Sequence, residues 1–321
     1  MHNILITGGA GFIGSHVVEE MRKQFPEARL VILDKMTYAA DIRNMDGSLD
    51  WDRCRLVVGD LCDFDLCQRV TRDVDCVVHV AAESHVDNSF GNSLQFTRSN
   101  TLGTHSILEA CRINGVKRII HVSTDEVYGE IEQGAHTETD ILTPTNPYSA
   151  SKAGADMIAI SYVHSFKLPL TIIRSNNIFG IRQYPEKLIP KFTLLGLAGK
   201  KLPMHGTGKN RRRFLAVEDF AAAISLLLRN GAPGEIYNAG TDEEYSNLEV
   251  AEMICNVLGL RISEALTFVQ DRPFNDSRYA LDSSKIRKLG WSPSRSLKTR
   301  LPEVVKWYES HFSRFNQIET A

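Results

Sequence analysis

The first half of the chain alternates short apolar runs with longer stretches that repeat at helical spacing. The apolar runs are rich in Val, Ile and Leu and show little polar alternation, which is typical of strands covered on both faces. Strands and helices alternating in this way predict a parallel sheet with helical crossover connections. The predicted strands are residues 4–7, 30–33, 55–58, 76–80, 118–123 and 170–174. The predicted helices include residues 12–23, 103–114 and 148–166.

The second half of the chain is less regular, because prolines divide it into shorter pieces. Two of its segments, 214–229 and 235–239, have patterns that allow them to return to the sheet. We therefore expect an α/β fold with a Rossmann-type, doubly wound parallel sheet at residues 1–175, joined by later segments at about 214–240. A smaller C-terminal α/β domain is expected at residues 176–321. No linker separates the two parts, so we expect them to interleave.

Composition and charge narrow the possible partners. With 43% hydrophobic and 24% charged residues, the chain has the balance of a globular protein. Its net charge of −2 provides no overall field for nucleic acid or a membrane surface, so the basic run at 209–213 is expected to be local charge. There is no run of about 18 apolar residues and no charged leader, so we expect a cytoplasmic protein. The six cysteines lack CxxC spacing, so neither a disulfide nor a metal site is expected.

A glycine-rich turn directly follows the first predicted strand. Residues 8–14 read GGAGFIG, which fits G-x-G-x-x-G starting at Gly9 and G-x-x-G-x-x-G starting at Gly8. Glycines at these places permit a tight turn and let backbone N–H groups approach a pyrophosphate. Asp34 ends the second strand about 20 residues beyond Gly14, where a carboxylate can bind adenine ribose and repel a 2′-phosphate. The combination predicts binding of NAD.

Tyr148 and Lys152 form a Y-x-x-x-K pair within a predicted helix. The i, i+4 spacing places both side chains on one face. An ammonium near the phenol stabilises phenolate, and such a tyrosine can accept a proton from a sugar hydroxyl. The same pair without other motifs is usually a surface lysine beside a half-buried tyrosine. Its position downstream of a nucleotide-binding turn favours the catalytic interpretation.

Two adjacent carboxyl groups, Asp125 and Glu126, follow the fifth predicted strand. Residues at the carboxyl end of a parallel strand face the ligand crevice of such sheets. Crowding and desolvation there favour protonation of one carboxyl group, which would place an acid beside a base. By itself, the pair would more simply be a solvated acidic turn.

Taken together, these motifs resemble the family of dTDP-glucose and UDP-glucose 4,6-dehydratases, which are extended short-chain dehydrogenases/reductases. The resemblance covers nearly the whole chain and implies a nucleotide-hexose 4,6-dehydratase with tightly bound NAD that is regenerated in each turnover. Oxidation at C4 would precede elimination of water across C5 and C6 and return of hydride to C6. The matching segments are ITGGAGFIGS, AAESHVDNS, STDEVYGE, NPYSASKAG, NNIFG, PEKLIPKF and DRPFNDSRYALD.

The resemblance also implies residue roles. Tyr148 would be the base at the C4 hydroxyl, supported by Lys152, and Thr124 would hydrogen-bond to that hydroxyl. Glu126 would remove the C5 proton, and Asp125 would protonate the departing C6 hydroxyl. Positions that match the cofactor site are Gly8, Gly11, Phe12, Ile13, Gly14, Asp34, Lys35, Asp60, Leu61, Ala81, Ala82, Ser99, Tyr148, Lys152 and Asn177. Positions that match the nucleotide-sugar site are Ser84, Thr124, Asn176, Lys187, Leu188, Arg212, Asn247, Asp271, Arg272 and Asn275.

Several alternatives stay open at this point. A nucleotide-sugar 4-epimerase or decarboxylase shares the glycine turn and the Tyr-Lys pair but typically lacks the Asp-Glu couple. A non-catalytic NAD-binding interaction protein would have no need of all four catalytic residues. The departures at Arg213 and Asn275 from the commoner family pattern leave dTDP-glucose and UDP-glucose both possible. A homodimer is expected from the resemblance, with helices 103–114 and 148–166 forming a four-helix interface across a two-fold axis.

Overall fold

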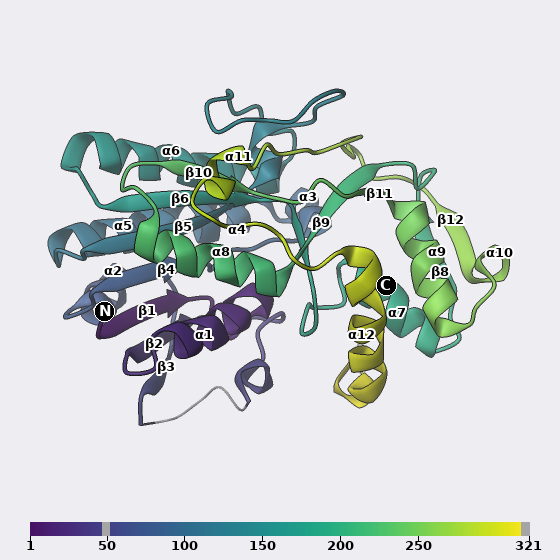
Figure 1. Ribbon diagram of the computed structural model, residues 1–321, viewed down its shortest axis with the longest axis horizontal. Coiled ribbons are helices and arrows are strands. Elements are labelled where there is room, and N and C mark those ends of the chain that lie inside the picture. The colour runs from purple at the N-terminus through teal and green to yellow at the C-terminus, as the bar shows by residue number, and fades with distance from the viewer. Residues whose placement is uncertain (47–51, 316–321) are drawn as a thin grey trace.

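The larger part of the molecule is built on a seven-stranded parallel sheet. The computed structural model describes residues 1–46 and 52–315. The strand order is β10-β6-β5-β4-β1-β2-β3, with the first strand near the centre, as in a Rossmann-type fold (Figure 1). The strands are β1 (Asn3–Thr7), β2 (Arg29–Asp34), β3 (Cys54–Val58), β4 (Cys76–His79), β5 (Arg118–Thr124), β6 (Leu170–Ser175) and β10 (Ile236–Ala239).

Helices cover both faces of this sheet. Successive residues of a strand point to opposite faces, and here the residues on both faces are apolar. Ile4 and Ile6 of β1 pack into a core with α1 and α8, whereas Leu5 packs on the opposite face with α2, α5 and α6. The doubly wound α/β prediction is therefore confirmed. The helices of this region are α1 (Phe12–Gln24), η1 (Ile42–Met45), α2 (Phe64–Thr71), α3 (Val86–Gly91), α4 (Ser93–Phe96), η2 (Thr97–Leu102), α5 (Gly103–Ile113), η3 (Asp125–Tyr128), α6 (Pro147–Phe166), α8 (Val217–Asn230) and α11 (Ser284–Arg287).

The six strands predicted from the apolar runs all form, with end shifts of one residue. Two of these shifts extend β5 to Thr124 and β6 to Ser175, so each strand carries one more polar residue to the carboxyl edge. The helical turns that precede α5 were not predicted, and the one at Thr97–Leu102 is π-helical.

The smaller part has its own apolar core, formed by α7, α9 and α12 around short strands. A three-stranded sheet has the order β11-β9-β7, and a two-stranded sheet pairs β12 with β8. Figure 1 shows this part beside the carboxyl edge of the main sheet. Its elements are β7 (Asn177–Phe179), α7 (Leu188–Leu197), β8 (Leu202–His205), β9 (Arg211–Ala216), β11 (Glu244–Ser246), α9 (Asn247–Leu258), α10 (Ile262–Ala265), β12 (Leu266–Val269), α12 (Leu297–Ser310) and η4 (Phe312–Phe315).

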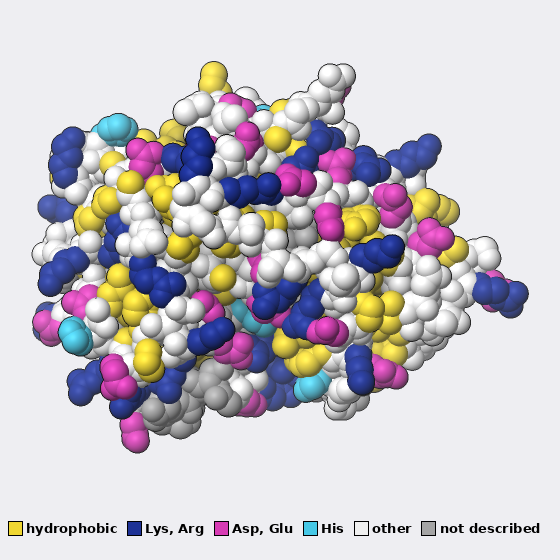
Figure 2. Space-filling view, in the orientation of Figure 1, with side chains coloured by type: hydrophobic (Ala, Val, Ile, Leu, Met, Phe, Trp, Pro, Cys, Tyr) yellow, Lys and Arg dark blue, Asp and Glu magenta, His cyan; other side chains and the backbone are white. Residues whose placement is uncertain are grey.

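The chain crosses between the two parts more than once. After β9, α8 packs in the same core as α1, and β10 then pairs in parallel with β6 at the sheet edge. Figure 2 shows basic and acidic side chains interspersed over the visible face, which agrees with the net charge of −2. Within residues 1–46 and 52–315, no helix has the length and apolar composition needed to cross a membrane.

Candidate active site

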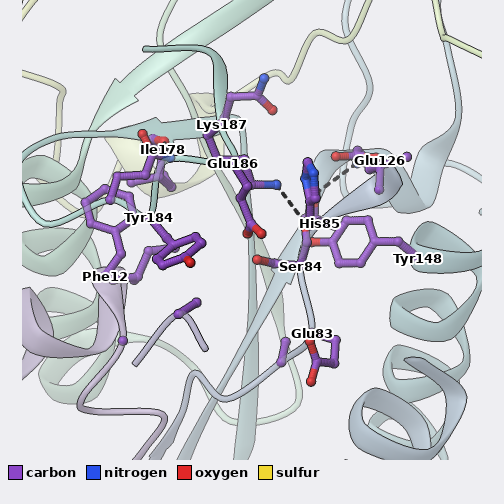
Figure 3. Close-up of a pocket in the computed structure, with 18 of the residues that line it drawn as sticks. Phe12, Glu83, Ser84, His85, Glu126, Tyr148, Ile178, Tyr184, Glu186 and Lys187 are labelled. Atoms are coloured by element: carbon purple, nitrogen blue, oxygen red, sulfur yellow. Dashed lines mark hydrogen bonds between the residues drawn. The ribbon is translucent and has the colours of Figure 1, made fainter. Parts of the chain in front are cut away.

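A cavity of about 430 Å³ lies at the carboxyl edge of the main sheet and is lined by both parts of the chain. This is where ligands bind in open α/β sheets, because the strand ends and the loops after them converge there. All the site residues proposed from the sequence line the cavity except Asp125 and Asp271. In Figure 3, Tyr148 and Lys187 point toward Ser84 from opposite sides.

The turn between β1 and α1 requires glycine at two places. Gly8 has φ of +71°, a conformation that residues with a Cβ rarely adopt. A Cβ at Gly14 would lie 1.9 Å from the Gly8 carbonyl oxygen, so a side chain cannot fit there. Gly8, Gly11 and Gly14 line the cavity, whereas Gly9 packs close to Ile32. The structure therefore selects the G-x-x-G-x-x-G interpretation, and α1 begins at the cavity with no side chain capping its N–H groups.

Asp34 stands at the end of β2 and is only 7% exposed. Its carboxylate accepts hydrogen bonds from the N–H of Ala10 at 2.9 Å and of Met36 at 2.8 Å. Burial raises the pKa of Asp34, and these hydrogen bonds oppose that shift. Lys35 forms an ion pair with Asp60 at 2.8 Å, so its ammonium is already partnered by a carboxylate. The wall of the cavity here suits the hydroxyl groups of a ribose better than a phosphate.

The pair Tyr148 and Lys152 lies on α6, whose start is fixed by a capping box. The Asn146 side chain accepts from the Ser149 N–H at 2.9 Å, and the Asn146 N–H donates to the Ser149 hydroxyl at 3.1 Å. Tyr148 is 8% and Lys152 4% exposed, and both line the cavity. The Lys152 ammonium donates to the Val122 carbonyl of β5 at 2.7 Å, so the helix is tied to the strand that ends at Thr124.

The pKa of Tyr148 differs from our expectation of a lysine-stabilised phenolate. Burial raises this pKa above its ordinary value, and the charges of Glu126 and Asp125 raise it further. A hydrogen bond with Thr124 acts in the opposite direction. Burial also lowers the pKa of Lys152 to about 8. In the protein alone, desolvation and two nearby carboxyl groups therefore disfavour the phenolate form of Tyr148.

Asp125 and Glu126 differ in exposure although they are adjacent. Glu126 lines the cavity, whereas Asp125 is 3% exposed and lies behind the lining. The Asp125 carboxyl accepts from the Asn176 amide at 2.9 Å and from the Thr124 hydroxyl at 3.2 Å. Burial, assisted by Glu126, raises the pKa of Asp125 to about 7. Burial raises the pKa of Glu126 as well, but the charges of Lys187 and Arg212 oppose that shift.

Two cations approach the cavity from the smaller part. Lys187 directly precedes α7 without capping its N–H groups, and its ammonium donates to the Ser84 carbonyl at 2.6 Å. Arg212 on β9 donates to the Asp276 carbonyl at 2.8 Å, and its guanidinium lies 4.6 Å from the centre of the Tyr279 ring. Lys187 and Arg212 are therefore held in place by protein groups, and both face a cavity large enough for an anionic ligand.

The run that begins at Asp271 is only partly in the site. Arg272 and Asn275 line the cavity, and Arg272 forms an ion pair with Asp87 at 2.6 Å. Asp271 is exposed and does not line the cavity, so its contact with a nucleotide-sugar stays a prediction. Its carboxylate accepts from the Asn275 amide at 2.9 Å, so it holds a neighbour that does line the cavity.

Many residues of the cavity wall were not singled out from the sequence, among them His85, Glu186 and Asn146. Burial lowers the pKa of His85 to about 3 and raises that of Glu186, which accepts from the Tyr38 hydroxyl at 2.8 Å. Asn146 contributes its amide to Glu126 at 3.4 Å in addition to capping α6. All three lie within the segments AAESHVDNS, PEKLIPKF and NPYSASKAG, so closer attention to these segments would have found them.

Comparisons with known proteins identify the family to which the chain belongs. A family model described as GDP-mannose 4,6 dehydratase matches residues 5–304. A trifunctional UDP-glucose 4,6-dehydratase, epimerase and reductase from Arabidopsis thaliana is 46% identical over 312 residues, which are 95% of this chain and 47% of that protein. The chain thus spans about half the length of that protein and of two further Arabidopsis relatives that it matches.

Two solved structures show how widely the fold is shared. A dTDP-glucose 4,6-dehydratase from Streptomyces venezuelae, with NAD and TYD bound, is 40% identical with a TM-score of 0.94, covering 99% of this chain and 100% of that one. A UDP-glucose 4-epimerase from Thermotoga maritima, with UDP-glucose, is 26% identical with a TM-score of 0.89, covering 97% and 99%. The fold alone therefore does not separate dehydratase from epimerase.

The raised pKa of Asp125 predicts a specific dependence of stability on pH. In the folded protein the pKa of this carboxyl is raised to about 7, whereas its ordinary value is 3.8, so folding takes up a proton between these two pH values. The free energy of unfolding should therefore fall as pH rises through this window. In Asp125→Asn, the decrease in the free energy of unfolding between these pH values should be smaller by up to a few kcal/mol. The measurement is urea unfolding at pH 5 and pH 8. Glu252→Gln, at an exposed carboxyl of α9, is the control. An unchanged slope in Asp125→Asn would contradict the burial argument.

Proposed function

The chain belongs to the GDP-mannose 4,6 dehydratase family, and we propose that it is a nucleotide-hexose 4,6-dehydratase acting on UDP-glucose or dTDP-glucose. The product is the 4-keto-6-deoxyglucose nucleotide. The observation that carries the proposal is the carboxyl pair at the end of β5, a buried Asp125 with a pKa near 7 beside a cavity-lining Glu126. Elimination of water needs such an acid and base at one substrate.

The glycine turn and the wall around Asp34 fit NAD. Gly8, Gly11 and Gly14 leave room for a pyrophosphate at the start of α1, and Asp34 suits the adenine ribose. When bound, NAD supplies hydride acceptance and return, so the overall reaction needs no added reductant. The remaining residues proposed to contact it are Phe12, Ile13, Lys35, Asp60, Leu61, Ala81, Ala82, Ser99, Tyr148, Lys152 and Asn177, all of which line the cavity.

Tyr148 is proposed to accept the proton of the C4 hydroxyl. Thr124, which hydrogen-bonds with Tyr148, orients that hydroxyl. Lys152 holds a positive charge beside the phenol while its ammonium is anchored on Val122. Since burial raises the pKa of Tyr148 in the protein alone, the phenol has to lose its own proton to solvent before it accepts that of the C4 hydroxyl, and the positive charge of Lys152 would favour this loss.

Elimination is assigned to the two carboxyl groups. A ketone at C4 acidifies the C5 hydrogen, and Glu126 is the cavity-lining base able to remove it. Asp125 keeps its proton near neutral pH and delivers it to the departing C6 hydroxyl. For this, the Asp125 carboxyl must exchange its hydrogen bond from Asn176 for one to the substrate, because Asp125 lies behind the cavity wall.

Binding of the nucleotide diphosphate is assigned to Lys187 and Arg212. The chain has a net charge of −2, so a diphosphate has to be bound by local cations, and both side chains are positively charged. The Arabidopsis relative is named for UDP-glucose and the Streptomyces structure for dTDP-glucose, and both substrates fall within the proposal. The other residues proposed to hold the nucleotide-sugar are Ser84, Thr124, Asn176, Leu188, Asn247, Arg272 and Asn275.

Two alternatives are weaker on the same evidence. A 4-epimerase shares the scaffold but has no use for an acid and a base at C5 and C6. A non-catalytic NAD-binding protein would not need Tyr148, Lys152, Asp125 and Glu126 assembled at one cavity edge. We also propose a cytoplasmic location, in keeping with six free cysteines of which five are buried.

A homodimer is proposed from the surface of α4, η2 and α6. Leu94, Leu102 and Met157 on these elements are 82%, 49% and 49% exposed, although α6 packs closely beside η2. Large apolar side chains gathered on one helical surface are typical of an association site. A two-fold axis would bring α5 and α6 of two chains together as a four-helix interface.

A Glu126→Gln variant tests the dehydratase assignment. The amide cannot accept the C5 proton, so substrate oxidised at C4 but still carrying its C6 hydroxyl should accumulate. Formation of the dehydrated product should slow by about 10²–10⁴-fold, the usual contribution of one acid–base group. Mass spectrometry of quenched reactions distinguishes the two species. Asp125→Asn should be affected less, since its amide can still donate a hydrogen bond. Product formation by Glu126→Gln at the parent rate would refute the assignment.

The dimer is tested with charges placed on the apolar surface. The double variant Leu102→Glu, Met157→Glu should elute as a monomer in size exclusion with light scattering, because like carboxylates would meet across the axis. Phe268→Glu, at an exposed apolar residue of β12, should leave the mass unchanged. A parent protein that is already monomeric, or a double variant that stays dimeric, would contradict this interface.

A further inference from the structure

Beneath the catalytic pair lies a carboxylate with no role in the chemistry proposed above. Asp156 is on α6, one helical turn beyond Lys152, and its side chain is fully buried. Its carboxylate accepts from the Arg174 guanidinium of β6 at 2.9 Å. The other carboxylate oxygen lies 3.2 Å from the imidazole of His121 on β5. A carboxylate this far from solvent is rare unless charged partners hold it.

We propose that Asp156 is a positioning residue that keeps Lys152 charged and in place for catalysis. The proposal rests on the function proposed for Lys152 and extends it to a group that does not contact the cavity. Spacing of i, i+4 puts the carboxylate and the ammonium on the same helix face. Asp156 therefore acts on the reaction through Lys152.

Lys152 needs such a counter-charge because it is nearly without solvent. Its ammonium donates to the Val122 carbonyl, a neutral partner, at 2.7 Å. Burial lowers the pKa of Lys152 to about 8, and the charge of Asp156 opposes this shift. The pKa of Asp156 itself is held at about 2 by His121, Arg174 and Lys152, so its charge persists over the working range of pH.

The other groups around the ammonium do not supply a negative charge. His121 on β5 and His79 on β4 stack at 5.3 Å between ring centres, and burial lowers the pKa of both, so they are neutral. Tyr148 on α6 has a raised pKa and is neutral as well. Arg174 on β6 is positively charged and therefore supplies no negative charge either. Asp156 is thus the carboxylate on which the charge of Lys152 depends.

The same ion pair also reaches the element that carries the catalytic acids. The Arg174 guanidinium lies 4.7 Å from the centre of the Tyr128 ring, and Tyr128 ends the short helix that begins at Asp125. The Tyr128 hydroxyl donates to the Asn238 side chain of β10 at 2.9 Å. Asp156 therefore links α6, through Arg174, to the backbone that positions Asp125 and Glu126.

The test uses variants whose effects on Lys152 have opposite signs. Asp156→Asn removes the negative charge, so the Lys152 pKa should fall by about one unit or more, a tenfold change in acid dissociation. Arg174→Gln removes the positive charge and leaves Asp156, so the pKa should rise. In the double variant, the Lys152 pKa should lie between the values of the two single variants. The double variant leaves no unpaired charge of the Asp156–Arg174 pair in the core. The measurement is competitive labelling of Lys152 with acetic anhydride against pH, read by peptide mass spectrometry, beside the pH profile of kcat.

In Asp156→Asn, the high-pH limb of the kcat profile and the labelling midpoint should both move to lower pH. In Arg174→Gln, both should move to higher pH. If Asp156→Asn does not fold, a labelling midpoint in Arg174→Gln at or below that of the parent overturns the proposal. Shifts in one direction in both single variants would also overturn it, since that is the signature of simple loosening. Labelling does not depend on turnover. Opposite midpoint shifts in a protein that fails to dehydrate nucleotide-hexoses would support the link between Asp156 and Lys152 and contradict the proposed function.

Discussion

The hydrogen bond from the Lys152 ammonium to the Val122 carbonyl fixes the position of α6 on β5, and the arrangement of the active site depends on it. The bond joins the helix that carries Tyr148 to the strand that ends at Thr124. Because Asp125 and Glu126 follow directly, this contact positions Tyr148 relative to the two carboxyl groups. The capping box at Asn146 secures the start of the same helix and reaches Glu126 as well.

Charge inside the cavity is arranged so that neighbouring groups have different protonation states. Burial raises the pKa of both carboxyl groups, but Lys187 and Arg212 act against the shift at Glu126, and Asp125 has its pKa raised further by Glu126. In the proposed reaction, these two similar side chains would serve as an acid and a base. The chemistry thus depends on burial and on cations from the smaller part of the chain, whose strands and loops close one side of the cavity.

Much of the fold could be predicted from the sequence, because strands of a covered parallel sheet consist of continuous apolar residues. Because parallel strands end at the same edge of a sheet, the residues that follow these strands could also be predicted to lie at one edge. The choice between Gly8 and Gly9 could not be made, since both are glycine and only the packing against Ile32 distinguishes them. The direction of the Tyr148 pKa and the position of Asp125 behind the cavity wall depend on desolvation, which spacing does not reveal. The π-helical turn at Thr97–Leu102 and the pairing of β12 with β8 have no periodic signal in the sequence.

The most direct test of the account follows one hydrogen atom. UDP-glucose or dTDP-glucose carrying deuterium at C4 is converted by the purified protein, and the product is examined by NMR and mass spectrometry. The account predicts a 4-keto-6-deoxy sugar with the deuterium at C6, because hydride taken from C4 is returned to C6 after water has left. Deuterium retained at C4 of a sugar whose C6 hydroxyl is intact would contradict the dehydratase assignment and indicate an epimerase.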